Sequence, residues 1–224
     1  MANNKPIHII VTIVILVAVF SALFIFQNQV FSQEQANNVS PFGINAFYVP
    51  ESVATTLALQ SSQEVIQALE TQTVPEYLNL GVSWGRIHPA AFGSFSWDNI
   101  DSDKDGRNLN FSSQDSYVQL AQKYNINLLP SLSPESNWLQ DSNYVPANIE
   151  AYRSYVRQTV ERYDGDGVND VPGLLFPIKY WQLDNEADLR YTVRGDGFES
   201  PSEYYQVLKA TYEAVKAADP SALL

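Results

Sequence analysis

The feature that most constrains the fold is a fourfold alternation of short apolar runs with segments of helical periodicity. The runs are expected to be β-strands, and they lie at residues 42–47, 82–87, 126–131 and 178–184. A helical segment follows each run, and no hairpin signal separates one run from the next. Strands that alternate with helices in this way form parallel βαβ units, which build either an open doubly wound sheet or a TIM barrel.

The helical segments carry their own start and stop signals. Ser61 and Glu64 have the spacing of a capping box, and the same pattern recurs at Ser200 and Glu203, with Pro201 at the first helical position. Pro75 and Pro146 are each expected to open a helix, and Ser112 or Ser113 is expected to cap another from the position before its first turn. The last helix is expected to stop at Asp219 and Pro220.

The stretch after the first expected strand favours a barrel. A doubly wound nucleotide-binding sheet has a glycine-rich turn at this point, whereas this chain has Tyr48-Val49-Pro50-Glu51. A complete barrel needs eight strands and about 250 residues. We therefore interpret residues 41–224 as the first four βα units of a TIM (β/α)8 barrel, with a fifth strand expected to begin at residues 222–224.

The first 40 residues are expected to lie outside this domain. Residues 7–26 form a run of twenty almost wholly apolar residues, which is long enough to span a membrane as a helix. An uncleaved anchor is favoured because cleavable signal peptides have shorter apolar regions, although Val30-Phe31-Ser32 keeps cleavage open. Lys5 lies in the stub at residues 1–6, and the polar linker at residues 27–40 has no basic residue. Because positive charge tends to stay on the cytoplasmic side of a membrane, this distribution predicts that the domain is exported.

Composition argues against several classes of partner and site. The chain has 25 acidic and 13 basic residues, and a net charge of −12 argues against nucleic acid because phosphate binding needs clustered cations. It has no cysteine, so disulfides and thiolate metal sites are excluded. One of its two histidines, His8, lies in the apolar run, so a histidine-based metal site is not expected.

Two acidic turns, at residues 101–106 and 164–170, carry oxygen ligands of the kind that calcium prefers. The first has the spacing of the start of an EF-hand loop, but Ser112 stands where that loop needs a bidentate glutamate. We interpret both turns as solvated acidic surface, with weak calcium binding as the alternative, and we expect no cofactor.

Polar side chains follow the expected strands at their carboxyl ends, where barrel enzymes build their active sites. They are Asn45, Arg86 with His88, residues 131–135, and Asp184-Asn185-Glu186, with Trp84, Trp138 and Trp181 nearby. Aromatic faces can stack on a neutral sugar, and amides and carboxylates can bind its hydroxyl groups. The set therefore indicates a pocket for a carbohydrate.

The chain resembles the amino-terminal half of a retaining glycoside hydrolase of the large clan of (β/α)8 barrels that includes cellulases, β-galactosidases and β-xylosidases. Residues 80–87 and 181–186 carry the resemblance, at the second and fourth expected strands. It implies that Glu186 is the catalytic acid/base, that Asn185 binds the sugar's 2-hydroxyl, and that Arg86 helps to order the nucleophile carboxylate. Asn45, Trp181 and His88 are expected to contact the substrate.

The resemblance also implies a second carboxylate, the nucleophile, which in this clan ends the seventh strand and would lie beyond Leu224. Asp184 is interpreted either as a negative charge that keeps the proton on Glu186 or as an ion-pair partner. Its candidate partners are Arg86, Lys179 and Arg190.

The leading hypothesis is a glycosidase that hydrolyses O-glycosidic bonds of an extracellular oligo- or polysaccharide. These 224 residues alone are expected to be inactive because they supply only one of its two carboxylates. A non-catalytic carbohydrate-binding protein on the same fold is the alternative, since a fold does not fix a function.

Overall fold

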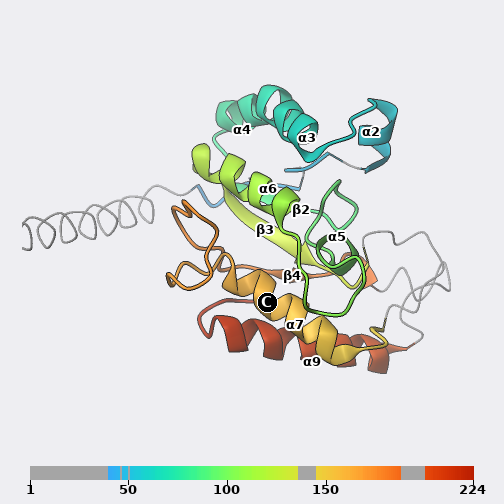
Figure 1. Ribbon diagram of the computed structural model, residues 1–224. Coiled ribbons are helices and arrows are strands. Elements are labelled where there is room, and N and C mark those ends of the chain that lie inside the picture. The colour runs from blue at the N-terminus through green and yellow to red at the C-terminus, as the bar shows by residue number, and fades with distance from the viewer. Residues whose placement is uncertain (1–39, 46, 50, 136–144, 188–199) are drawn as a thin grey trace, which may run out of the picture. The chain divides into compact units, whose positions relative to one another are not determined.

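The computed structural model of the protein describes residues 40–45, 47–49, 51–135, 145–187 and 200–224 (Figure 1). Within these ranges one parallel sheet is formed in the order β1-β2-β3-β4. Its strands are β1 (Gly43–Ile44), β2 (Trp84–Ile87), β3 (Asn127–Leu132) and β4 (Gln182–Leu183). This arrangement confirms the predicted parallel order. Leu223 also pairs in parallel with Tyr180, so a further segment joins the sheet beside β4.

Helices occupy every connection between these strands. Between β1 and β2 lie α2 (Glu51–Thr56), α3 (Ser62–Ala68), the π-helical turn η1 (Leu69–Thr73) and α4 (Val74–Leu80). The later helices are α5 (Trp97–Ile100) and α6 (Ser112–Lys123) before β3, α7 (Ile149–Glu161) before β4, and α9 (Pro201–Ala218) after it. The sequence did not predict α2, α5 or η1, which are all short.

Two of the expected helix starts are confirmed. The Ser61 hydroxyl accepts a hydrogen bond from the Glu64 N–H, and the Glu64 carboxylate accepts one from the Ser61 N–H, which completes the capping box of α3. The Ser200 hydroxyl caps α9 by accepting from the Glu203 N–H at 3.3 Å. Each cap satisfies N–H groups that the first helical turn cannot pair internally.

Two other helix starts differ from the expectation. Helix α6 begins at Ser112 itself with no side-chain cap from its preceding residue, and the Asn110 Oδ1 accepts the Ser112 N–H at 3.1 Å. Helix α7 begins at Ile149 rather than Pro146, because the Asn148 side chain accepts the Ala151 N–H at 3.1 Å and so marks the start. In both cases an asparagine side chain supplies the oxygen that accepts a backbone N–H of the first turn. The expected serine hydroxyl and proline do not fill this role.

Alternate residues of β2 face opposite sides of the sheet. Gly85 and Ile87 are buried, whereas Trp84 and Arg86 are only half-buried. Gly85 allows a close approach to the first strand, because a Cβ atom at this position would lie 2.6 Å from the Cβ of Phe47. The buried side of β2 therefore faces the hydrophobic core, and the side with Arg86 is left for polar contacts.

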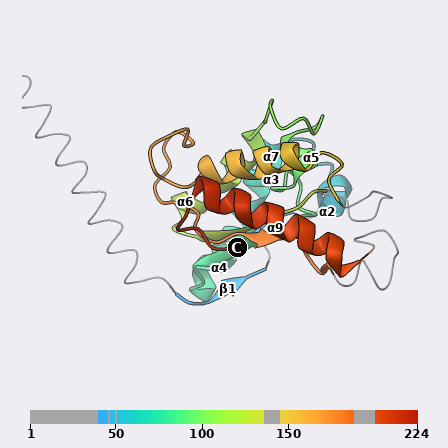
Figure 2. The same cartoon turned by 90° about the horizontal axis from the view of Figure 1, so that it is seen from below.

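The core beneath α7 is rich in aromatic side chains. Tyr152 and Tyr155 are completely buried, and both pack on Trp97, at ring-centroid distances of 5.4 Å and 6.2 Å. Figures 1 and 2 both show α9 alongside α7. A hydrogen bond of 3.0 Å between the hydroxyls of Tyr152 and Thr211 joins the two helices. Helix packing and aromatic burial thus close this side of the sheet.

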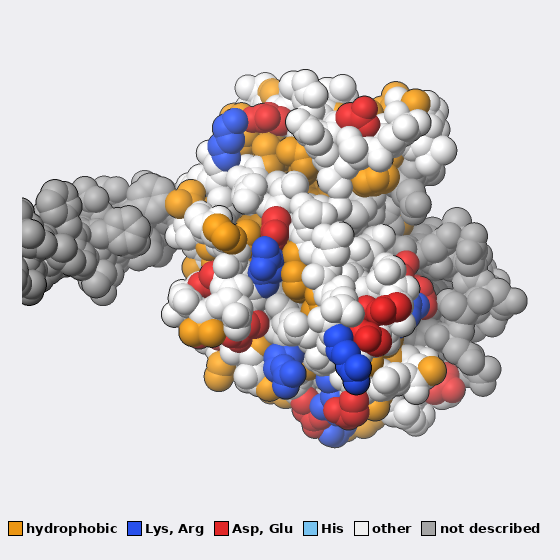
Figure 3. Space-filling view, in the orientation of Figure 1, with side chains coloured by type: hydrophobic (Ala, Val, Ile, Leu, Met, Phe, Trp, Pro, Cys, Tyr) orange, Lys and Arg blue, Asp and Glu red, His pale blue; other side chains and the backbone are white. Residues whose placement is uncertain are grey.

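The outer surface around these helices carries acidic and basic side chains side by side, as Figure 3 shows for one face. Arg153 pairs with Glu213 at 2.7 Å, and Arg162 pairs with Asp115 at 2.6 Å. Such pairs neutralise charge locally in a chain whose net charge is −12.

No helix among residues 40–45, 47–49, 51–135, 145–187 and 200–224 combines the length and the apolar character needed to cross a membrane. The expected anchor at residues 7–26 lies outside these ranges, as does nearly all of the linker. Both stay predictions.

Candidate active site

Arg86, the third residue of β2, is the centre of a polar cluster at the carboxyl ends of the strands. Its guanidinium group donates hydrogen bonds to three amide oxygens: Asn45 Oδ1 at 2.8 Å, Gln182 Oε1 at 2.7 Å and Asn185 Oδ1 at 2.9 Å. Because Ile44 pairs with Gly85 in the sheet, the next residues along the two strands, Asn45 and Arg86, are neighbours. One side chain therefore joins β1, β2 and β4.

Neutral oxygens rather than a carboxylate fill these three donor positions of Arg86. Burial lowers the pKa of Arg86, and the nearby Tyr48, Glu186 and Asp184 oppose this effect. The guanidinium group has lost part of its hydration, and amide oxygens replace water around it. A cation held in this way keeps positive potential at the strand ends.

Asp184 is the buried carboxyl group of the cluster. Its N–H donates to the carbonyl of Leu132 at 2.7 Å and so continues the ladder between β3 and β4. Its side chain is fully buried, and burial raises its pKa to about 7, opposed by the N–H of Asn185 and by the charge of Arg86. Near neutral pH the carboxyl group can therefore hold or release a proton.

The candidate ion-pair partners of Asp184 behave differently from one another. Lys179 pairs instead with Asp219 at 2.6 Å. Arg86 acts on Asp184 through its charge while its guanidinium hydrogen bonds go to the amide oxygens. Arg190 lies outside the described residues.

Glu186 follows Asn185 at the end of this stretch and is exposed. Its backbone has φ = 50°, and that of Asp184 has φ = 57°, so two non-glycine residues out of three adopt the left-handed conformation. Each such residue costs about 1–3 kcal/mol, and such strain is concentrated at functional sites. The sharp change in chain direction places the Asn185 oxygen on Arg86 and leaves the Glu186 carboxyl facing solvent.

Trp181 is placed in the core instead of lining a cleft. Only 3% of its surface is exposed, and its ring packs edge-on against Phe95 at a centroid distance of 6.1 Å. Side chains alternate along a strand, so Trp181 and Leu183 lie on the buried side while Gln182 reaches Arg86. The expected sugar contact of Trp181 is therefore not available in this structure.

His88 and Trp84 also make contacts within the protein. The Nδ1 atom of His88 accepts the Ala90 N–H at 3.0 Å, and its ring stacks on Tyr48 at 5.7 Å. Trp84 meets the ring of Tyr180 edge-on at 5.2 Å. His88 thus caps the turn after β2. Trp138 and the arginines of residues 188–197 lie outside the described residues.

Gln182 is the member of the cluster that the sequence did not predict. Besides accepting from Arg86, its amide donates to the carbonyl of Asp184 at 2.7 Å. It was interpreted as part of a buried strand, although its position two residues before Asp184 places both on one side of an extended chain. That alternation was the available signal.

Two groups of acidic side chains in the described residues have the spacing of a metal site, and neither includes the Arg86 cluster. They are Asp101, Asp103 and Asp105, and Asp164, Asp166 and Asp170. The residues around Arg86 thus form a site of one cation, three amides and two carboxyl groups. Such a site can bind hydroxyl groups and transfer protons.

Several known structures are similar to parts of this chain. A glucosidase from Croceicoccus marinus matches with a TM-score of 0.50 and 20% sequence identity, over 66% of this chain and 30% of its own. A family 39 glycoside hydrolase from Bacteroides cellulosilyticus WH2 matches with a TM-score of 0.46 and 14% identity, over 80% of this chain and 30% of its own. Xylanase XynB from Paenibacillus barcinonensis matches with a TM-score of 0.45 and 16% identity, over 70% of this chain and 45% of its own.

The likeness to the glucosidase concerns the fold: about two thirds of this chain, with its parallel strands and helices, corresponds to part of the glucosidase structure. This confirms, for the fold, the resemblance found in the sequence. The chain spans less than a third of the glucosidase's length. No protein-family model and no curated protein matches the sequence.

Proposed function

We propose that the domain supplies the acid/base side of the active site of a retaining glycoside hydrolase, with Glu186 as the acid/base. The observation that carries the proposal is the hydrogen bond between Arg86 and Asn185, directly before Glu186 at the end of β4. It joins two residues that are 99 positions apart in the chain, next to Glu186 at one sheet edge, in a fold similar to that of a glucosidase. The substrate would be an extracellular oligo- or polysaccharide, which rests on the predicted export.

The hydrogen bond to Arg86 supports a role for Asn185 in binding a sugar hydroxyl. Its Oδ1 atom is held by Arg86 at 2.9 Å, and this bond points its Nδ2 amino group away from the guanidinium. The amino group would donate to the 2-hydroxyl of the bound sugar. Hydrogen bonds to this hydroxyl strengthen in the transition state of glycoside hydrolysis and supply part of the rate enhancement.

Glu186 would act twice. In the first step it gives its proton to the glycosidic oxygen while a second carboxylate attacks the anomeric carbon, so the aglycone leaves and a glycosyl ester forms. In the second step the Glu186 carboxylate takes a proton from water, whose oxygen attacks the same carbon and releases the second carboxylate. Exposure of Glu186 gives both the aglycone and water access to it.

The second carboxylate must lie about 5–5.5 Å from the acid/base for retention. We assign it to a later strand of the barrel, outside the four strands β1 to β4. Arg86 would then help to order that carboxylate by charge. Its three guanidinium hydrogen bonds go to neutral amide oxygens, which do not cancel its positive charge.

The test compares the rates at which the natural full-length protein and its Glu186→Gln variant hydrolyse aryl glycosides. With a poor leaving group, which needs the proton, we expect the variant to be slower by about 10²–10⁴-fold. With a strongly activated leaving group the first step should be nearly unchanged. Glu76→Gln, at an exposed glutamate of α4, serves as the control.

Equal rates of Glu186→Gln and the wild type on the poor leaving group would remove Glu186 from the mechanism. Binding of an oligosaccharide by the wild type without any turnover would instead support the carbohydrate-binding alternative.

A further inference from the structure

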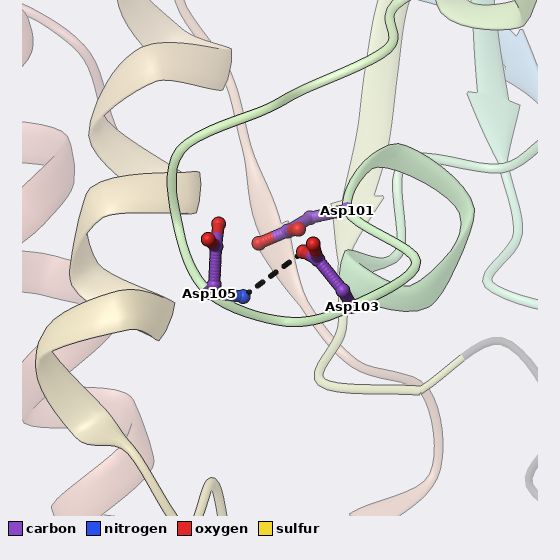
Figure 4. Close-up of side chains that lie close together, drawn as sticks. All are labelled: Asp101, Asp103 and Asp105. Atoms are coloured by element: carbon purple, nitrogen blue, oxygen red, sulfur yellow. Dashed lines mark hydrogen bonds between the residues drawn. The ribbon is translucent and has the colours of Figure 1, made fainter.

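A loop between α5 and α6 brings three carboxyl groups together. Figure 4 shows the side chains of Asp101, Asp103 and Asp105 pointing toward one another. One oxygen from each lies within 4.8 Å of the others. Three negative charges this close repel one another unless a cation or protons lie between them.

Asp101 supplies a second and independent observation. Its side chain is 0% exposed. Its Oδ2 atom accepts hydrogen bonds from the Trp97 indole N–H at 2.9 Å and from the Gly106 N–H at 2.7 Å. Its Oδ1 atom, equally buried, has no hydrogen-bond donor among the described residues. A buried carboxylate oxygen without a donor is destabilising, and native proteins rarely leave one unsatisfied.

The basic residue within the loop is directed to another partner. Lys104 forms an ion pair with Glu135, beyond the end of β3, and lies 5.7 Å from the centroid of the Trp97 ring. The described ion pairs thus join Lys104 to Glu135 and not to the three aspartates. A cation that satisfies the buried oxygen would have to come from solvent.

The second acidic turn lacks the equivalent of Asp101 Oδ1. Asp164, Asp166 and Asp170 accept hydrogen bonds from backbone N–H groups within the turn, at 2.7–3.1 Å. None of their oxygens is among the buried atoms without a donor. The pattern of acids is similar, but the unsatisfied buried oxygen distinguishes the turn at residues 101–106.

We propose that Asp101, Asp103 and Asp105 bind a calcium ion, with the buried Asp101 Oδ1 as the innermost ligand. Calcium accepts 6–8 oxygen ligands in irregular geometry, so backbone carbonyls and water can complete its coordination, whereas magnesium requires a nearly ideal octahedron. Three carboxylates without the bidentate glutamate of an EF-hand give a weak site, on the order of 10⁻⁴–10⁻³ M. This is the calcium range of modules that work outside cells.

The loop that would hold the ion is itself bonded to neighbouring parts of the fold. The carbonyl of Gly106, at the end of the loop, accepts hydrogen bonds from Ser154 Oγ at 2.8 Å and from Gln158 Nε2 at 3.1 Å, both on α7. On the other side, Lys104 of the loop pairs with Glu135 beyond β3. The backbone N–H of Trp97, in α5 just before the loop, donates to the carbonyl of Ser133, directly after β3, at 2.8 Å. The loop therefore lies between α7 and the carboxyl end of β3. The proposal does not depend on the glycosidase assignment.

The experiment uses terbium as a luminescent probe that binds oxygen sites like those of calcium. The full chain, kept in mild detergent because of residues 7–26, is titrated with Tb³⁺ and excited through tryptophan. Trp97 is one hydrogen bond from Asp101, so an ion in this loop receives its energy efficiently. We expect sensitised terbium emission that millimolar calcium displaces and equal magnesium does not.

Two variants test the ligands. Asp103 and Asp105 are both exposed, so Asp103→Asn and Asp105→Asn should keep the fold, which circular dichroism checks. We expect each variant to bind calcium with an affinity lower by about tenfold or more, as measured in this titration, since each removes a charged ligand. Asp166→Asn, an exposed aspartate of the other acidic turn, is the matched control and should keep the wild-type affinity.

Wild-type affinity in both Asp103→Asn and Asp105→Asn would overturn the proposal, and so would the absence of sensitised emission. An equal loss in Asp166→Asn would show diffuse attraction to an acidic surface and would overturn it too. Equal displacement by magnesium would reject calcium as the ion.

Discussion

The helix-covered side of the sheet and its polar carboxyl edge are built from the same strands but differ in what holds them together. Beneath α7 the contacts are aromatic rings with no exposure, such as Tyr152 and Tyr155 against Trp97. At the edge, Arg86 and its three amide partners are half-buried or exposed and are joined by hydrogen bonds. Water can replace the second kind of contact and not the first.

This difference implies a division of roles along each strand. Covered positions determine the fold because their burial contributes most of the free energy of folding. The hydrogen-bonded positions around Arg86 contribute less, and the same edge carries features that cost stability: a fully buried carboxyl group and two left-handed residues. The predictions below test that division.

The largest effect is expected on the covered side. Tyr155 is 0% exposed, and its hydroxyl donates to the carbonyl of Phe95. Tyr155→Ala should lower the free energy of unfolding by about 3–5 kcal/mol, because it leaves a large cavity. Urea unfolding measures this. Tyr205→Ala, on α9 with 61% exposure, should change it by less than about 0.5 kcal/mol, and similar losses in the two would contradict the division.

The buried carboxyl group at the edge predicts a pH effect of nearly the same size. The folded state raises the pKa of Asp184 to about 7, whereas an unfolded aspartate has a value of about 3.9. Between these values the folded state holds the proton and the unfolded state does not, so this contribution to stability is present below pH 4 and is lost as the pH rises through 7.

Asp184→Asn removes this titration. At about 1.4 kcal/mol for each pKa unit, the variant should gain up to roughly 4 kcal/mol relative to the wild type between pH 4 and pH 8. Urea unfolding of both proteins across this range gives the difference directly. Parallel stability curves would mean that Asp184 titrates normally in the folded protein.

The smallest change in stability is expected for Arg86. Arg86→Met removes three hydrogen bonds, but its partners are exposed or half-buried and can bind water, and a partly buried charge is also removed. The free energy of unfolding should fall by about 1 kcal/mol or less. A fall near that of Tyr155→Ala would show that the edge, too, holds the fold.

Much of the fold could be predicted because its signals are local. The capping residues Ser61 and Ser200 satisfy N–H groups three positions away, so the sequence alone identifies them. The expected strand at 178–184 was harder to place. Its regular part is only Gln182–Leu183, and residues 179 and 181 bond instead to Leu223, a partner some forty residues along the chain.

The candidate site shows the same limit. The sequence placed Asn45, Arg86 and Asn185 at one sheet edge, since the carboxyl ends of parallel strands meet there. It did not show that Trp181 faces the core, because the side of the sheet that a residue faces depends on the register of its neighbours. Nor did it show that Asp184 is buried, a property set by distant packing.

The hydrogen bonds to Gly106 bear on how the molecule folds in time. The carbonyl of this residue is bound by side chains 48 and 52 positions later in the chain. The loop at residues 101–106 can therefore reach its final shape only after α7 has docked, and we expect it to form late in folding. Contacts that form after the transition state alter the unfolding rate and leave the folding rate nearly unchanged. An ion held in this loop would lengthen the lifetime of the folded state without hastening its formation.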